Sequence, residues 1–271
     1  MIVAGCDIGS TWGKALIMNN GNIASYTIRP VHHIPVKTAH EVIEEAIRQA
    51  GLSSLEDIDY IVGTGYGRLM MIPFAHHTVP EIACHARGAQ WLVRGLRTVL
   101  DIGGQDCKVV GLHEDGRIRE YLYNDKCASG TGRFLERVAK VLRLDVKELS
   151  SLSLQAQNPA AITSQCSVFA ESEIVTLLNQ GKEIPDIIAG INEAIASRLA
   201  TLVNKVGLLE DFTVTGGCAN NLGLIAILEE KLGIPVKRFS EDPQIGGALG
   251  AAVIAAERSK EGGKKNGDSR P

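Results

Sequence analysis

The sequence predicts an α/β protein built from a duplicated domain. The tripeptide Asp-Ile-Gly occurs at Asp7 and again at Asp101, and each copy lies between short apolar strands. In both copies a lysine follows seven residues after the aspartate, and an Asn-Gly or Asp-Gly turn comes next. Helical and strand patterns alternate through the rest of the 271 residues, which is typical of an α/β fold. Self-similarity over roughly 94 residues indicates two related domains rather than a solenoid of short repeats.

The first half is expected to contain the first copy of this hairpin and three further elements. Residues 1–23 read as strands joined by a glycine turn and an Asn-Gly turn, a strong hairpin signal. A helix is expected over 38–50, where Thr38 and Glu41 form a capping-box pattern before an apolar stripe. A buried strand follows at 60–62 and a helix at 81–95.

The second half repeats the hairpin at 98–118 and is then mainly helical. The patterns predict helices near 130–143, 167–180 and 186–206, a strand at 212–214, a helix at 220–232, a short strand at 235–239 and a last helix at 244–259. We therefore expect one domain over 1–97 and a second over 98–243, with the helix at 244–259 packed back onto the first. The polar, glycine-rich residues 260–271 are expected to form a disordered tail.

The composition excludes several classes of protein. Hydrophobic residues make up 45% of the chain, so it is not intrinsically disordered. A formal net charge of −3 and 4% aromatic residues argue against nucleic-acid binding. We expect no secretion signal, and the sequence has no apolar run near the roughly 20 residues of a membrane span. Six cysteines without a C-x-x-C motif fit a reducing compartment better than a disulfide framework. We expect a cytoplasmic protein that binds no membrane.

The glycine turns carry the predicted chemistry. A turn of Gly9, Ser10 and Thr11 offers the backbone N–H and hydroxyl groups that bind phosphate, and Gly103, Gly104 and Gln105 repeat it. Each copy also brings one carboxylate, from Asp7 and Asp101, which suits a hydrated Mg²⁺. A third glycine site, Thr215–Asn220, ends a strand and lets a flat ring approach the backbone.

These three segments, taken in order, resemble the phosphate-1, phosphate-2 and adenosine motifs of the actin, sugar kinase and Hsp70 ATPases. The resemblance implies two ribonuclease-H-like domains with ATP or ADP and Mg²⁺ in the cleft between them. It implies catalytic roles for Asp7, Asp101 and Gln105. The implied nucleotide ligands are Gly9, Ser10, Thr11, Lys14, Gly103 and Gly104 at the phosphates and Gly216, Gly217 and Asn220 at the adenosine.

Two cysteines lie at expected helix starts. Cys127 stands in the segment Asn124–Glu136 and Cys166 in Ser164–Glu173. The positive end of a helix dipole lowers a thiol pKa and stabilises an anionic cluster. Two cysteines cannot fill a four-cysteine site, but a symmetric dimer would supply four. On the residues alone, a buried or merely reactive cysteine at each helix start stays open as the alternative.

These two cysteine segments resemble the activator ATPases of 2-hydroxyacyl-CoA dehydratases and the ATPase subunits of benzoyl-CoA reductase. The resemblance covers residues 1 to about 257. It implies a homodimer in which Cys127 and Cys166 of both copies bind one [4Fe–4S] cluster. It further implies a ferredoxin or flavodoxin as electron donor and an iron–sulfur dehydratase or reductase as the partner that receives the electron.

Two other functions stay open at this point. A small-molecule kinase of the same fold would need a substrate-binding insertion, and no clear insertion is present. An ATPase-like redox sensor would use the cluster without passing an electron to an enzyme. The sequence does not name the partner enzyme, its acyl-CoA substrate or the electron donor.

Overall fold

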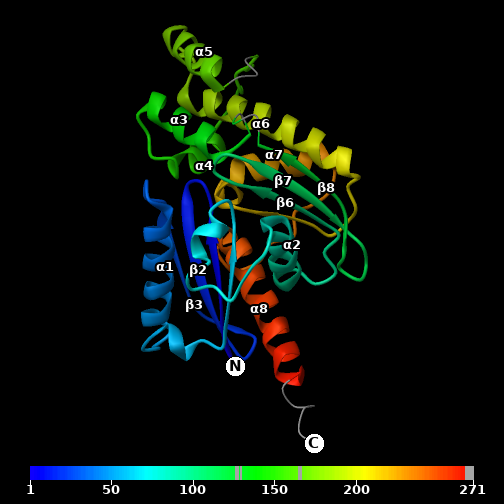
Figure 1. Ribbon diagram of the computed structural model, residues 1–271. Coiled ribbons are helices and arrows are strands. Elements are labelled where there is room, and N and C mark those ends of the chain that lie inside the picture. The colour runs from blue at the N-terminus through cyan, green and yellow to red at the C-terminus, as the bar shows by residue number, and fades with distance from the viewer. Residues whose placement is uncertain (126–127, 129, 164–166, 266–271) are drawn as a thin grey trace, which may run out of the picture. The chain divides into compact units, whose positions relative to one another are not determined.

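The computed structural model describes residues 1–265 except 126, 127, 129 and 164–166. The chain forms two compact units: unit 1 comprises Met1–Arg94 together with the residues from Phe239 onward, and unit 2 comprises Gly95–Arg238. Each unit contains one β-sheet with helices packed on it (Figure 1). Among the described residues, no helix is long and apolar enough to cross a membrane.

Unit 1 has a five-stranded sheet in the order β3-β2-β1-β4-β5. The strands are β1 (Ile2–Ile8), β2 (Trp12–Asn19), β3 (Asn22–Pro30), β4 (Tyr60–Thr64) and β5 (His77–Thr78), and the helices are α1 (Pro35–Gln49), α2 (Glu81–Leu92) and α8 (Gly246–Lys265). Side chains alternate along β1: Ala4, Cys6 and Ile8 join a core with α1, and Val3 joins a second core with α8. Figure 1 shows α1 on one face of this sheet and α2 and α8 on the other.

Glycines let α8 pack closely in unit 1. A Cβ on Gly5 of β1 would lie 1.9 Å from the carbonyl oxygen of Ala248, and a Cβ on Gly250 would lie 1.7 Å from that of Cys84 on α2. Both distances are far shorter than any carbon–oxygen contact, so α8 contacts β1 and α2 backbone to backbone. The C-terminal helix is thereby part of the core of unit 1.

We expect Gly250→Ala to destabilise the protein. The added methyl group clashes with backbone atoms that no side-chain rotation can move, at a cost of about 3 kcal/mol. Thermal unfolding should show a midpoint lowered by roughly 6–12 °C. Arg258→Ala, on the exposed face of the same helix, is the control and should leave the midpoint unchanged. An unchanged midpoint in Gly250→Ala would contradict this packing.

Unit 2 has a four-stranded sheet in the order β8-β7-β6-β9. The strands are β6 (Thr98–Ile102), β7 (Cys107–Leu112), β8 (Ile118–Asn124) and β9 (Phe212–Thr215), and the helices are α3 (Gly132–Leu142), α4 (Glu148–Ser153), α5 (Ser167–Asn179), α6 (Ile184–Val206) and α7 (Leu222–Leu232). One face of the sheet, with Leu100, Val109 and Val214, forms a single core with α6 residues such as Ile191 and Leu199.

The two units repeat one strand register, which explains the repeat in the sequence. Asp7 at the end of β1 lies opposite Lys14 on β2. Asp101 at the end of β6 lies opposite Lys108 on β7. The lysine recurs seven residues after the aspartate because a tight hairpin sets this cross-strand pairing.

Two predicted helix starts were wrong. Helix α1 begins at Pro35 and not at residue 38, since proline suits the first turn of a helix. Thr38 is therefore buried inside α1, where its Oγ1 accepts a hydrogen bond from the backbone N–H of His32 at 2.9 Å instead of capping the helix. Helix α7 begins at Leu222 and not at residue 220, because the Asn221 side chain provides the N-terminal cap.

Two predictions near the C-terminus also need correction. In place of the strand expected at 235–239, the structure has an isolated β-bridge, in which Val236 pairs with Phe212. The last helix runs beyond residue 259 to Lys265, so residues 260–265 are helical rather than part of a disordered tail. The remaining residues of the expected tail, 266–271, lie outside the described residues.

Candidate active site

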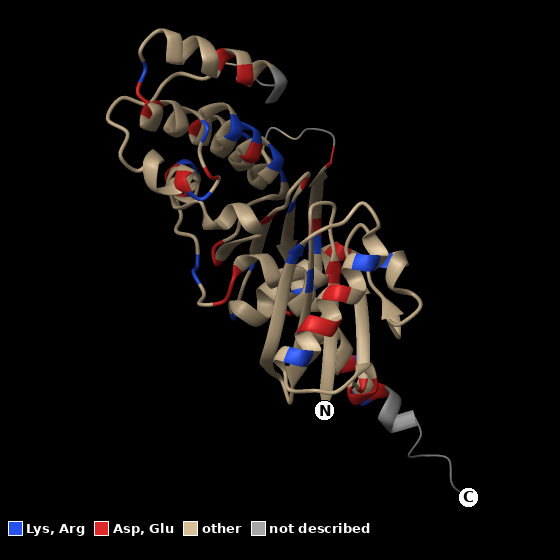
Figure 2. Cartoon of the chain, turned by 90° about the vertical axis from the view of Figure 1, so that its left-hand side faces the viewer, with Lys and Arg blue, Asp and Glu red and all other residues tan. Residues whose placement is uncertain are grey.

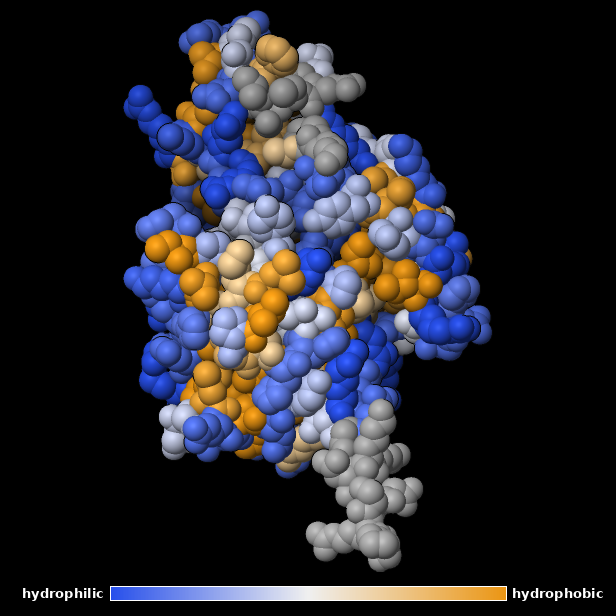
Figure 3. All heavy atoms as spheres, in the orientation of Figure 1, coloured by the Kyte–Doolittle hydropathy of each residue, from blue (hydrophilic) through white to orange (hydrophobic). Residues whose placement is uncertain are grey.

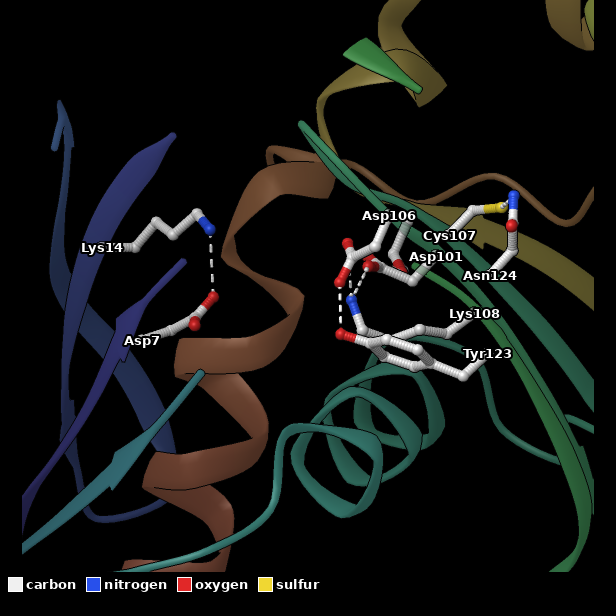
Figure 4. Close-up of polar contacts among 9 residues, drawn as sticks. Asp7, Lys14, Asp101, Asp106, Cys107, Lys108, Tyr123 and Asn124 are labelled. Carbon is white, nitrogen blue, oxygen red and sulfur yellow. Dashed lines mark hydrogen bonds and ion pairs between the residues drawn. The ribbon is translucent and has the colours of Figure 1, made fainter. Parts of the chain in front are cut away.

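The first candidate site lies at the end of β1 in unit 1. Asp7 is 2% exposed, and its Oδ2 forms an ion pair with Lys14 Nζ at 3.0 Å (Figure 4). The backbone N–H of Gly9 donates to the carbonyl oxygen of Trp12 and closes the turn that contains Ser10 and Thr11. Lys14 Nζ lies over this turn, 3.5 Å from where a Gly9 Cβ would be. The structure thus brings together all five residues that the sequence assigned to this half.

Two further glycines enclose the Asp7 carboxylate, and the sequence analysis missed both. A Cβ on Gly65, which has φ +92°, would lie 2.4 Å from Asp7 Oδ1. A Cβ on Gly247 would lie 2.7 Å from Asp7 Oδ2 and 3.2 Å from Cε1 of the buried His85. Gly247 is in the first turn of α8, so the positive end of that helix faces the carboxylate.

Gly65 had a detectable signal in the sequence. Thr64-Gly65 ends β4, which lies parallel to β1, and Thr215-Gly216 ends β9, which lies parallel to β6. Thr64 is opposite Asp7 and Thr215 is opposite Asp101. The duplication therefore extends to a third segment in each unit, and Thr-Gly marks it.

The second candidate site lies at the end of β6 in unit 2. Asp101 is 3% exposed; its Oδ1 accepts a hydrogen bond from Thr215 Oγ1 at 2.9 Å, and its Oδ2 lies 3.4 Å from Lys108 Nζ. The backbone N–H of Gly103 donates to the carbonyl oxygen of Asp106 at 2.9 Å and closes the turn. Gly103 and Gly104 are half-buried, and Gln105 at the tip of the turn is exposed.

The predicted adenosine segment is in contact with this turn. Gly216 has φ +85°, and a Cβ there would lie 2.3 Å from the carbonyl oxygen of Ile102, the residue before Gly103. Gly217 begins a short 3₁₀ helix (Gly217–Asn220) that ends at the exposed Asn220. Unit 2 therefore places Gly216 and Gly217 beside Asp101 and its glycine turn.

Helix α3 is hydrogen-bonded directly to the same turn. The backbone N–H of Gly132 donates to the carbonyl oxygen of Gly103 at 2.9 Å, and that of Arg133 donates to Gly104 at 2.8 Å. A Cβ on Gly132 would also lie 3.6 Å from Cys218 Sγ in the adenosine segment. The start of α3 is thus in contact with both predicted nucleotide-binding segments of unit 2, which no sequence pattern indicated.

The oxygen-rich groups at these sites fit Mg²⁺. Each unit offers a buried carboxylate at its glycine turn, and Mg²⁺ in nucleotide sites is held by one or two carboxylates together with phosphates and water. Among the described residues, no three His, Cys, Asp or Glu side chains gather into an all-protein metal site. This donor set suits a metal that enters with its nucleotide.

Four of the six cysteines lie within the described residues. Cys6, Cys84, Cys107 and Cys218 are buried free thiols. Burial raises the pKa of Cys6 far above its usual range, and it raises the pKa of Cys84 to about 12, of Cys107 to about 11 and of Cys218 to about 12. The predicted cluster ligands, Cys127 and Cys166, lie outside the described residues.

Charge is mixed on the surface. On the side of the chain shown in Figure 2, basic and acidic residues are interspersed. Figure 3 shows small groups of hydrophobic side chains among hydrophilic ones. In unit 1 the exposed apolar side chains include Tyr66, Leu69, Met70 and Ile72, which follow Gly65 in the chain.

Solved structures of two dehydratase activators resemble this chain over almost its whole length. The structure of the activator of 2-hydroxyisocaproyl-CoA dehydratase from Clostridium difficile with bound ADPNP matches with a TM-score of 0.91 and 39% identity over 98% of each chain. Component A of (R)-2-hydroxyglutaryl-CoA dehydratase from Acidaminococcus fermentans matches with a TM-score of 0.92 and 39% identity over 96% of this chain and 99% of the other. A ROK hexokinase from Thermus thermophilus shares the fold alone, with a TM-score of 0.53 and 17% identity over 96% and 100% of the two chains. The predicted α/β fold of the actin and sugar-kinase type is therefore confirmed.

Sequence comparison gives the family. A benzoyl-CoA reductase subunit from Thauera aromatica is 33% identical over 271 residues, which cover 96% of this chain and 95% of that one. The model of the BadF/BadG/BcrA/BcrD ATPase family matches residues 4–255, a range that includes both aspartate hairpins, the Thr215–Asn220 segment and both cysteine segments. The chain belongs to the BadF/BadG/BcrA/BcrD ATPase family, and its close homologues are activators of 2-hydroxyacyl-CoA dehydratases.

Proposed function

We propose that this protein hydrolyses ATP to drive the transfer of a low-potential electron to an iron–sulfur enzyme of the 2-hydroxyacyl-CoA dehydratase or benzoyl-CoA reductase type. The observation that carries this proposal is the hydrogen bonding of α3 to the Gly103-Gly104 turn. Helix α3 begins five residues after Cys127 in the sequence, so a change at the nucleotide is transmitted toward that cysteine.

The nucleotide roles follow from the two hairpins. Asp7 and Asp101 hold Mg²⁺ and, with Gln105, orient the water that attacks the γ-phosphate. The Gly9-Ser10-Thr11 turn and Lys14 bind phosphate oxygens; Lys14, with 15% of its side chain exposed, is accessible to a ligand. Gly103 and Gly104 bind phosphates from unit 2, and Gly216, Gly217 and Asn220 flank the adenosine.

The cysteine roles are those that the family resemblance implies. Cys127 and Cys166 of two copies of the chain hold one [4Fe–4S] cluster, and the other four cysteines are buried free thiols. When bound, such a cluster supplies one electron at low potential. A ferredoxin or flavodoxin is the proposed donor, and the cytoplasm the proposed compartment.

The structure offers a way for ATP to control the cysteine segment. Gly103 and Gly104 are the proposed phosphate ligands of unit 2, and their carbonyl oxygens accept hydrogen bonds from the first two residues of α3. Loss of the γ-phosphate moves this turn, and α3 moves with it. The coupling requires no contact between the nucleotide and the cysteines.

Gly132→Pro tests this link. Gly132 is the first residue of α3, a position where proline is well tolerated, and Thr131 before it has the extended backbone that proline requires. Proline removes the N–H that binds Gly103 and places its Cδ against the same carbonyl oxygen, so the start of α3 has to move away from the turn while the hydrogen bonds within the helix are kept. We expect the variant to hydrolyse ATP but to lose most of the effect of MgATP on the rate at which a ferrous chelator removes iron.

Gly132→Ala is the matched control. It keeps the N–H, and its methyl group meets neighbours at 3.4–3.6 Å, which are ordinary contacts. The alanine variant should therefore respond to MgATP as the wild type does. A full response in the proline variant would refute the link through α3.

A further inference from the structure

The equivalent lysines of the two hairpins differ in their surroundings. Lys14 pairs with Asp7, and its side chain is 15% exposed. Lys108 is 3% exposed, and its Nζ lies between two carboxylates, 3.4 Å from Asp101 Oδ2 and 3.0 Å from Asp106 Oδ1. A phosphate can reach the Lys14 ammonium group, whereas the buried Lys108 ammonium group is held between two carboxylates.

Tyr123 on β8 completes the enclosure of Lys108. The two residues are directly opposite each other in the sheet. The Tyr123 hydroxyl donates a short hydrogen bond to Asp106 Oδ2, and Lys108 Nζ lies 5.3 Å from the centre of the Tyr123 ring. Figure 4 shows Tyr123, Asp106, Lys108 and Asp101 linked in one chain of contacts.

This chain of contacts fixes the orientation of Asp101. Thr215 holds Oδ1 and Lys108 holds Oδ2, so both carboxylate oxygens are fixed by partners on neighbouring strands. Asp106 in turn fixes the glycine turn, because its carbonyl oxygen accepts the Gly103 N–H and its carboxylate lies over Gly103, 2.6 Å from where a Cβ would be. The turn and the aspartate are therefore held as one rigid piece.

We propose that Lys108 and Tyr123 are positioning residues for ATP hydrolysis, and that Lys108 is not a phosphate ligand. Lys108 holds Asp101 directly, and Tyr123 acts through Asp106, which holds Lys108 and the Gly103-Gly104 turn. The proposal rests on the proposed function, since it assigns Asp101 to Mg²⁺ and water. A rigidly held carboxylate needs no reorganisation as charge develops in the transition state. The two lysines of the repeat therefore have different tasks, Lys14 in binding and Lys108 in positioning.

Three variants distinguish these tasks. For each variant, calorimetry in the presence of Mg²⁺ gives the affinity for ADP, and steady-state kinetics gives kcat and KM of ATP hydrolysis. Tyr123→Phe removes one hydroxyl from a partly exposed ring, and we expect kcat to fall about tenfold, the effect of one hydrogen bond to a charged group, with ADP affinity unchanged. Lys108→Met should lower kcat further and also leave ADP affinity unchanged. Lys14→Met should weaken ADP binding.

Tyr121→Phe is the matched control, since Tyr121 lies two residues earlier on β8 and is 50% exposed; its kcat should equal that of the wild type. The proposal fails if Tyr123→Phe has the kcat of the wild type, or if Lys108→Met weakens ADP binding as much as Lys14→Met. The Tyr123→Phe result decides the matter even if Lys108→Met does not fold. A wild type that hydrolyses no ATP would instead refute the proposed function.

Discussion

Asp101→Asn is expected to abolish ATP hydrolysis and to leave the iron content of the protein unchanged. Asparagine has nearly the shape of aspartate, and its side-chain oxygen can still accept the hydrogen bond from Thr215 Oγ1. The negative charge that holds Mg²⁺ and water is lost. Removing one preorganised electrostatic group costs about a hundredfold or more in kcat. Because the cluster ligands are cysteines, iron binding does not depend on this charge.

The measurement is steady-state phosphate release at saturating MgATP, with iron determined on the same preparation. Asp115→Asn is the control, because Asp115 is an exposed carboxylate in the turn that follows β7, where it pairs with Arg117. That variant should hydrolyse ATP as the wild type does. Wild-type turnover in Asp101→Asn would show that the second hairpin is not catalytic.

Cys127→Ala and Cys166→Ala are each expected to lose iron and to weaken the dimer. A cluster held by two cysteines from each copy binds the dimer and not the monomer, so removing it shifts the equilibrium toward monomer. The wild type should contain about four iron atoms per dimer. Iron analysis and light scattering under anaerobic conditions measure both quantities.

Cys84→Ala is the control for these cysteine variants. Cys84 is buried in the core of unit 1, and burial raises its pKa to about 12, so it should contribute neither iron nor dimer contacts. A Cys166→Ala protein with full iron content would contradict the assignment. Four iron atoms per monomer in the wild type would contradict it equally.

The sequence predicted the backbone of the site better than its side-chain contacts. The repeated Asp-Ile-Gly with its lysine predicted the two hairpins, because strand register and turn length leave few alternatives for such a pattern. Thr64-Gly65 was detectable as the counterpart of Thr215-Gly216 but lies in a segment without the Asp-Ile-Gly signature. The duplication therefore includes the two Thr-Gly segments as well as the Asp-Ile-Gly hairpins that first indicated it.

Contacts between distant segments could not be predicted. Gly247 reaches Asp7 from the other end of the chain, and Tyr123 on β8 reaches Asp106 in the turn before β7. Hydrogen bonds from Gly132 and Arg133 to Gly103 and Gly104 use backbone atoms, which carry no sequence signature. Helix starts were misplaced at α1, which opens at Pro35 rather than at the capping-box pattern of Thr38, and at α7, where the Asn221 side chain caps a helix that begins at Leu222.

Electron transfer under anaerobic conditions tests the central claim most directly. The reduced protein is mixed with an iron–sulfur enzyme of the 2-hydroxyacyl-CoA dehydratase or benzoyl-CoA reductase type, and oxidation is followed by the absorbance near 400 nm in the presence of MgATP, of MgADP or of no nucleotide. Hydrolysis-driven transfer predicts rapid oxidation with MgATP and none with MgADP or without nucleotide. Equal oxidation in all three conditions would contradict it.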